Sequence, residues 1–165
     1  MRISSFSGGE SLMEKLRTLT EKVTEVNQVR IGFFSGATYP DGTSVPMVAA
    51  MNEYGTATSP ARPFFRNMIA DKSPGWAASL GAIAANNGLH AGKTMALMGE
   101  GIAGQLQDAI VAFDSVPLAE STAEAKGFKK QLIETAHMIN SVGYQVADGE
   151  VKHTDTKIIA PGGKK

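Results

Sequence analysis

Asn52-Glu53-Tyr54-Gly55, followed by Pro60-Ala61-Arg62-Pro63-Phe64-Phe65-Arg66, is the stretch that decides how the chain is organised. The first motif is typical of a helix that ends, because Gly55 can adopt the left-handed conformation that stops a helix. In the second motif, two prolines favour extended backbone before Phe64. The stretch therefore predicts a helix stop and then a rigid corner, which presents two aromatic rings between two arginines.

Before this corner the chain is expected to form a helix, a strand and a second helix. Five apolar residues at spacings of four, three, four and three predict an amphipathic helix over residues 10–26. They are Leu12, Leu16, Leu19, Val23 and Val26. Alternating apolar residues then predict a strand over residues 29–34. A polar loop over residues 35–43 leads into a helix over residues 45–54, which Ser44 caps.

After the corner the chain is expected to be mainly helical. The apolar pattern predicts a helix over residues 64–85, which Ser73-Pro74 bends or restarts. A long helix over residues 91–113 follows, and a short helix is predicted over residues 132–140. Alternating apolar residues then predict a last strand over residues 142–146.

This order of elements predicts one α+β domain over residues 1–147 and a flexible C-terminal arm over residues 148–165. Strands and helices do not alternate strictly, which is typical of a small antiparallel or mixed β-sheet packed with several α-helices. The arm is polar and has no convincing apolar pattern. With 165 residues, 42% of them hydrophobic, the chain is long enough to bury the core of such a domain.

Composition limits the partners and the compartment that the sequence allows. Sixteen basic and sixteen acidic residues give a formal net charge of zero, so we expect no strong attraction to DNA or to a membrane surface. A neutral chain also has little self-repulsion to oppose association with itself. The sequence has no cysteine, no signal peptide and no apolar run that could span a bilayer, so we expect synthesis in the cytoplasm.

Two glycine motifs resemble nucleotide-binding patterns but stand in the wrong context. Gly99-Glu100-Gly101-Ile102-Ala103-Gly104 matches a dinucleotide motif, which needs a strand before it, yet it lies inside a predicted helix. Gly92-Lys93-Thr94 lacks the glycine that a phosphate-binding loop requires five positions upstream, where Asn87 stands. Gly99, Gly101 and Gly104 either weaken their helix or mark close packing, and the sequence leaves both alternatives open.

The other candidate chemical groups do not form a pattern. His90, His137 and His153 have no histidine or cysteine at metal-ligand spacing, and no carboxylate pair or nucleophile motif stands out. We therefore expect no catalytic residue, no cofactor and no metal, and a protein that is not an enzyme. A small nucleotide-binding protein, based on the glycine motifs, stays as an alternative hypothesis.

Three segments together resemble the neck and tail-completion proteins of long-tailed bacteriophages, which include the family related to the lambda minor tail protein Z. The first segment runs from Val29-Arg30-Ile31-Gly32 through Tyr39-Pro40-Asp41-Gly42-Thr43 to Asn52-Glu53-Tyr54-Gly55. The second is the corner motif that ends at Arg66. The third includes Leu132-Ile133-Glu134-Thr135 and Ser141-Val142-Gly143-Tyr144-Gln145-Val146.

This sequence departs from the family pattern at two points. Asn52 stands where the family commonly has a histidine, and Gln131-Leu132-Ile133-Glu134-Thr135-Ala136 stands where the family commonly has Pro-Leu-Ile-Asp-Thr-Gly. The resemblance implies a structural virion protein that completes or terminates the tail tube and joins it to the head. A head-side connector or stopper is the alternative within the same class.

The resemblance also implies partners and a location. It implies a ring of copies of this chain, as a hexamer, with the tail tube protein and the connector or stopper proteins as further partners. DNA would only pass through the ring, and the protein would lie at the neck of the virion. Seven residues are the candidate interface: Tyr39, Asp41, Tyr54, Arg62, Phe64, Phe65 and Arg66. The alternative for Phe64 and Phe65 is that at least one ring closes the core.

Overall fold

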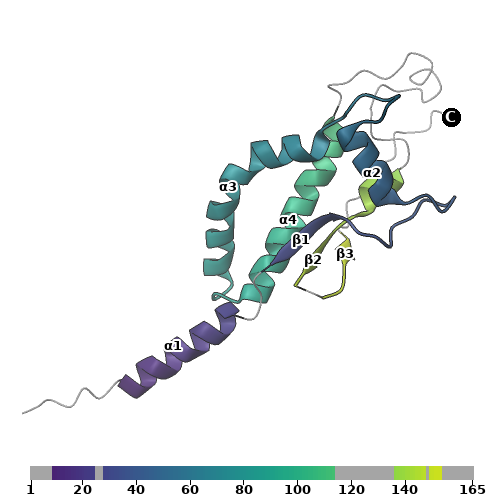
Figure 1. Ribbon diagram of the computed structural model, residues 1–165. Coiled ribbons are helices and arrows are strands. Elements are labelled where there is room, and N and C mark those ends of the chain that lie inside the picture. Colours follow the sequence, from purple (N-terminus) through teal and green to yellow (C-terminus); the bar gives the residue numbers. More distant parts are fainter. Residues whose placement is uncertain (1–8, 25–27, 114–135, 148, 154–165) are drawn as a thin grey trace, which may run out of the picture.

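The computed structural model describes residues 9–24, 28–113, 136–147 and 149–153 (Figure 1). Within these residues the helices are α1 (Gly9–Thr24), α2 (Val45–Tyr54), α3 (Phe64–Asn86), α4 (Ala91–Ala112) and α6 (Ala136–Asn140). The strands are β1 (Val29–Phe33), β2 (Val142–Val146) and β3 (Lys152–His153). They form one antiparallel sheet in the order β1-β2-β3, so the predicted α+β fold is confirmed and the sheet is antiparallel.

Helix α4 is the centre of the molecule, and it packs against both the sheet and α3 (Figure 1). Its buried side chains meet those of α2, α3, α6 and β2 in a single core. The fully buried side chains with the largest volumes include Phe64, Leu106, Ile110 and Ile139. The side-chain amide of Gln107, also buried, donates a hydrogen bond to the Ile139 carbonyl oxygen at 3.1 Å, which ties α4 to α6.

The sheet packs against α4 with one face, which is formed by alternate residues of β1 and β2. Val29 pairs with Val146, Ile31 with Tyr144 and Phe33 with Val142. A Cβ atom added at Gly99 of α4 would lie 2.8 Å from both the Tyr144 ring and the Val29 side chain. Helix and sheet therefore pack closely at Gly99, where α4 has no side chain.

Helix α2 begins and ends as the sequence predicts. The Ser44 hydroxyl accepts a hydrogen bond from the Met47 backbone N–H at 3.4 Å, and Pro46 lies in the first turn, where a missing N–H is tolerated. Gly55 follows the last residue with a φ of 78°. A Cβ at Gly55 would lie 2.7 Å from the Ala61 nitrogen, so a side chain is excluded there.

Helix α3 is continuous through Pro74 rather than restarted, and Figure 1 shows it bending away from α4 and then descending beside it. A proline in a helix interior removes one backbone hydrogen bond and bends the axis, which was one of the two predicted outcomes. The Trp76 indole N–H donates to the Gln105 side-chain oxygen at 2.9 Å. This bond ties the half of α3 beyond the bend to α4.

The remaining predicted elements are observed with equal or slightly different bounds, as far as the structure describes them. The helix predicted over residues 10–26 is observed as α1, the strand over residues 142–146 as β2, and only residues 136–140 of the last helix lie within the described chain. Strand β3 falls in the segment predicted as a flexible arm and was not predicted. It is two residues long and exposed on both, so it carries no apolar alternation that the sequence could show. Residues 154–165 of that arm lie outside the described residues.

Candidate functional site

The corner between α2 and α3 is organised around the carboxylate of Glu53, which lies in the last turn of α2 and is buried. Its two oxygens accept hydrogen bonds from the backbone N–H groups of Phe65 at 2.9 Å and Arg66 at 3.2 Å. These N–H groups belong to the first turn of α3, where the preceding residue, Pro63, offers no side-chain cap. Glu53 therefore caps α3 from another helix, and its charge also interacts favourably with the helix dipole.

Two arginines also form bonds across the same corner. The Arg66 guanidinium forms an ion pair with the Glu53 carboxylate at 3.2 Å and donates to the Glu53 carbonyl oxygen at 2.8 Å. Arg62 donates from its side chain to the Asn52 side-chain oxygen at 3.1 Å and from its backbone N–H to the Asn52 carbonyl oxygen at 2.6 Å. Arg66 therefore meets a carboxylate of its own chain, whereas Arg62 meets the amide group and the backbone of Asn52.

The two rings of the corner stack on each other, with centroids 6.5 Å apart, but they differ in burial. Phe64, with 1% of its surface exposed, meets Phe33 edge to face in the core, with ring centroids 6.4 Å apart. Phe65 is half-buried, and its ring lies over Gly32, where an added Cβ would be 3.5 Å away. Phe64 therefore closes the core, as the alternative predicted for at least one ring, and it offers no surface to a partner in this conformation.

Tyr54 is the most exposed aromatic residue of the corner, with 73% of its surface accessible. Its ring lies under the Arg66 guanidinium, whose central carbon is 5.4 Å from the ring centroid. A cation over an aromatic face is attracted by the ring electrons and holds both side chains in place. Together Tyr54 and Arg66 form an exposed, pre-arranged pair above the buried Glu53.

Tyr39 and Asp41 lie on a separate loop, which α6 holds in place. The His137 ring of α6 bonds to the Thr38 carbonyl oxygen at 2.6 Å and packs against the Tyr39 ring, with centroids 5.2 Å apart. Asp41 closes the turn by accepting from the Thr43 backbone N–H at 2.9 Å, and this bond lowers the pKa of the Asp41 carboxyl below its ordinary value. Asp41 itself is exposed, so the loop is fixed at its base and accessible at its tip.

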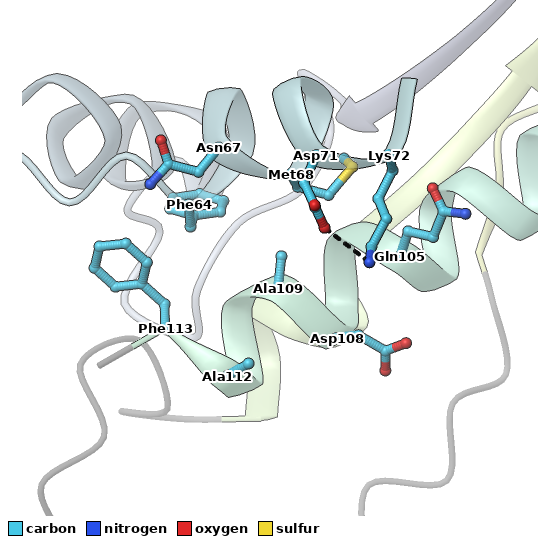
Figure 2. A pocket seen from close by; sticks show the side chains of 10 residues that line it. All are labelled: Phe64, Asn67, Met68, Asp71, Lys72, Gln105, Asp108, Ala109, Ala112 and Phe113. Atoms are coloured by element: carbon cyan, nitrogen blue, oxygen red, sulfur yellow. Dashed lines mark ion pairs between the residues drawn. The ribbon is translucent and has the colours of Figure 1, made fainter. Parts of the chain in front are cut away.

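A groove of about 440 Å³ opens between the first half of α3 and the second half of α4 (Figure 2). Its floor is apolar and includes Phe64, Met68 and Phe113. Asp71, Lys72 and Asp108 lie along its rim, with Lys72 paired to Asp71 at 2.8 Å. This groove has the size of a small-ligand site, but its few charges are paired or exposed at the rim and do not converge on one point.

Both glycine motifs lie within helix α4, and neither forms a phosphate-binding loop. Gly99-Glu100-Gly101-Ile102-Ala103-Gly104 lies in the middle of α4, and Gly92-Lys93-Thr94 lies in its first turn. The two alternatives for the glycines both apply. Gly99 marks close packing, whereas an added Cβ at Gly101 or Gly104 would meet nothing within 4 Å.

Within the described part of the chain, His, Cys, Asp and Glu do not gather in groups that could hold a metal ion. None of the helices there is both long and apolar enough to cross a membrane. Comparison with family models, with curated proteins and with solved structures finds no match. The resemblance to phage neck proteins therefore depends on the motif residues themselves.

The structure brings five of the seven candidate interface residues together at the corner and leaves the other two on the loop. Sequence reasoning missed the three residues that position them, namely Asn52, Glu53 and His137. Glu53 carried a usable signal, since a carboxylate one turn from a helix end can cap a helix that begins nearby. His137 carried none, because its partner Thr38 is almost a hundred positions away in the sequence.

Proposed function

We propose that this chain is a structural virion protein of a phage neck, which completes or terminates the tail tube and joins it to the head. The protein would be made in the host cytoplasm and assemble as a ring with copies of itself. It would act by protein–protein contact with the tail tube protein and the connector or stopper proteins. No catalytic step is part of this function.

The observation that carries the proposal is that the two most specific motifs of the resemblance meet in space. Glu53 of the first motif caps the helix that the second motif begins, and Arg66 of the second returns to Glu53 of the first. The motifs therefore act as one structural unit, which gives a physical reason for their occurrence together. That unit leaves Tyr54 and the Tyr39–Asp41 loop accessible, as contacts with neighbouring subunits require.

Deletion of the coding sequence from the phage genome that carries it tests the proposal. We expect lysates in which DNA-filled heads and tails both assemble but remain unjoined in electron micrographs. Supplying the protein from a plasmid should restore joined, infectious particles. Normal infectious particles after deletion would refute the proposal.

The same experiment separates the tail-side role from the head-side alternative. A tail-completion protein leaves heads filled with DNA and tails defective at their upper end. A connector or stopper leaves heads that lose their DNA while the tails are complete. Adding purified protein to each isolated component and then mixing them shows which component it must bind first.

A further inference from the structure

Strand β1 is an edge strand of the sheet, because β2 and β3 follow it on one side only (Figure 1). On its other side β1 pairs with no strand among the residues that the structure describes. Natural edge strands are often protected against pairing by prolines or charges. β1 is five residues long and has one charged residue, Arg30, and no proline. Its free edge is therefore little protected against pairing with another strand.

The hydrogen bonds between β1 and β2 show which backbone groups point to this free edge. In an antiparallel pair, residues that bond to the partner strand alternate with residues whose backbone groups point away from it. The Ala147 N–H donates to the Gln28 carbonyl oxygen at 3.0 Å, which fixes the phase of this alternation. The backbone N–H and C=O groups of Val29, Ile31 and Phe33 therefore point away from β2. None of them bonds to another group of the described chain.

A groove of about 260 Å³ lies beside the same strand. Residues 31–33 of β1 line one side of it, and Pro46, Ala49 and Ala50 of α2 line the other. The Phe65 ring also lines the groove, so most of its surface is apolar. The free edge of β1 thus combines a row of backbone groups with a place for an apolar side chain.

These two features together select the kind of occupant. Backbone donors and acceptors that recur at every second residue, about 7 Å apart, match the groups of an extended chain. A helix does not match them, since it bonds its own backbone groups internally. When a strand is added to a sheet edge, main-chain bonds give affinity and pockets for alternate side chains give specificity. The other strands of a second copy are poor occupants, because β2 is paired on both sides and β3 is two residues long.

We propose that the free edge of β1 binds an extended segment of another protein, which adds a fourth strand to the sheet and places an apolar side chain in the groove. The inference goes beyond the proposed function, because the contact needs only the edge and the groove and would hold for any role of the protein.

Amide hydrogen exchange of the full chain, measured by NMR, tests the inference. The probe is a peptide enriched on the immobilised protein from a library of random peptides of about eight residues. In the free protein the amide protons of Arg30 and Gly32, which bond to β2, should exchange slowly, and those of Ile31 and Phe33 should exchange fast. The peptide should slow exchange at Ile31 and Phe33 at least about tenfold. A library that yields no peptide with this effect would overturn the inference.

Methylation of the peptide backbone shows whether the contact is a strand pairing. Every second amide of an added strand faces β1, and the amides between them face away. N-methyl groups on the first set should abolish binding, and N-methyl groups on the second set should not. Equal binding by the two methylated peptides would contradict the pairing.

Two matched variants of α2 test the groove. Ala50 and Met51 are both exposed, but only Ala50 lines the groove. Ala50→Arg should weaken peptide binding at least about tenfold because its side chain fills the groove, and Met51→Arg, which adds the same charge, should leave binding unchanged. Thermal unfolding of both should match the wild type, since neither position is buried. Equal binding by the two variants would show that the groove takes no part.

The free protein supplies the remaining test. Slow exchange at Ile31 and Phe33 without peptide would overturn the inference, because the chain itself or a second copy would then cover the edge. Sedimentation equilibrium would separate these two cases. A chain that binds no peptide at this edge but still restores joined particles would refute this inference and leave the neck function standing.

Discussion

Glu53 is the residue whose removal should disturb the corner most. Glu53→Ala removes the acceptor for two backbone N–H groups of α3 and leaves Arg66 without its carboxylate. We expect the free energy of unfolding to fall by about 3 kcal/mol, the sum of a lost helix cap and a lost charged hydrogen bond. Glu53→Gln keeps one side-chain oxygen as an acceptor and should lose about half as much. Urea unfolding followed by circular dichroism measures both.

The control for Glu53, which lies in α2, is Asp71, an acidic residue of α3 that also has a basic partner. Asp71 pairs with Lys72 at 2.8 Å, but both side chains are exposed, and such surface pairs contribute little. Asp71→Asn should therefore leave the unfolding midpoint unchanged. An equal loss in Asp71→Asn and Glu53→Ala would mean that the buried cap has no special role.

Tyr144 should make the fold sensitive to alkaline pH. Burial, and then the negative charge of Glu100, raise the pKa of the Tyr144 hydroxyl above its ordinary value of 10.0. The folded state therefore holds this proton more tightly than the unfolded state. Its contribution to stability is fully present below about pH 10, and it is lost as the pH rises through the raised pKa.

Tyr144→Phe removes the titrating group but keeps the ring against Gly99. At pH 8 we expect the variant and the wild type to have similar melting temperatures. Between pH 8 and pH 11 the melting temperature of the wild type should fall, and it should fall by more than the melting temperature of the variant. A difference between the two proteins that is the same at both pH values would contradict the raised pKa.

At the scale of the element, the glycines of α4 provide a prediction with internal controls. An added methyl group at Gly99 would lie 2.8 Å from Tyr144 and Val29, so the sheet must shift to admit it. Overpacking of this kind costs about 1–3 kcal/mol and should exceed the helix propensity that alanine gains. Gly99→Ala should therefore destabilise the fold, as thermal unfolding can measure.

Gly101→Ala and Gly104→Ala should have the opposite effect. Both positions lie in the same helix as Gly99, and an added Cβ atom at either one would have no neighbouring atom within 4 Å. Each substitution should stabilise the fold by about 0.5–1 kcal/mol through helix propensity and a less flexible unfolded chain. Destabilisation in all three variants would mean that α4 packs closely along its whole length.

The elements also show which parts of this fold a sequence can predict. Helix α2 and strand β2 were predicted at the residues where they occur, because Ser44, Pro46, Gly55 and the alternation at residues 142–146 are local signals. Strand β3 has two polar residues and forms only because β2 offers it a free edge. The bond from Trp76, just beyond Pro74 in α3, to Gln105 on α4 likewise joins residues that are far apart in the sequence.

At the scale of the whole molecule, the candidate site was predicted as a set of residues but not as an arrangement. The corner motif was recognised, and Arg62 and Arg66 were predicted to lie on either side of its two rings. The sequence could not show that Arg66 meets Glu53 across a turn or that Arg62 meets Asn52 instead. Such pairings depend on how α2 and α3 cross, and no residue pattern of fixed period encodes that crossing.

The division between buried and exposed corner residues gives a last prediction, which concerns the assembled particle. Phe64 lies in the core, and Tyr54 lies on the surface beside Arg66. Phe64→Ala should lower the free energy of unfolding by about 3–5 kcal/mol and reduce head–tail joining because less protein is folded. Tyr54→Ala should leave the melting temperature nearly unchanged, because it removes little buried surface.

If the exposed corner contacts a neighbouring protein, Tyr54→Ala should still reduce the yield of joined particles in the plasmid complementation assay. Its defect would then come from binding, since the protein is as stable as the wild type. If Tyr54→Ala joins heads to tails at the wild-type level and only Phe64→Ala loses joining, the corner stabilises the fold and does not contact another virion protein. In that case the contacts with other virion proteins must lie elsewhere, and the exposed tip of the Tyr39–Asp41 loop becomes the first surface to substitute.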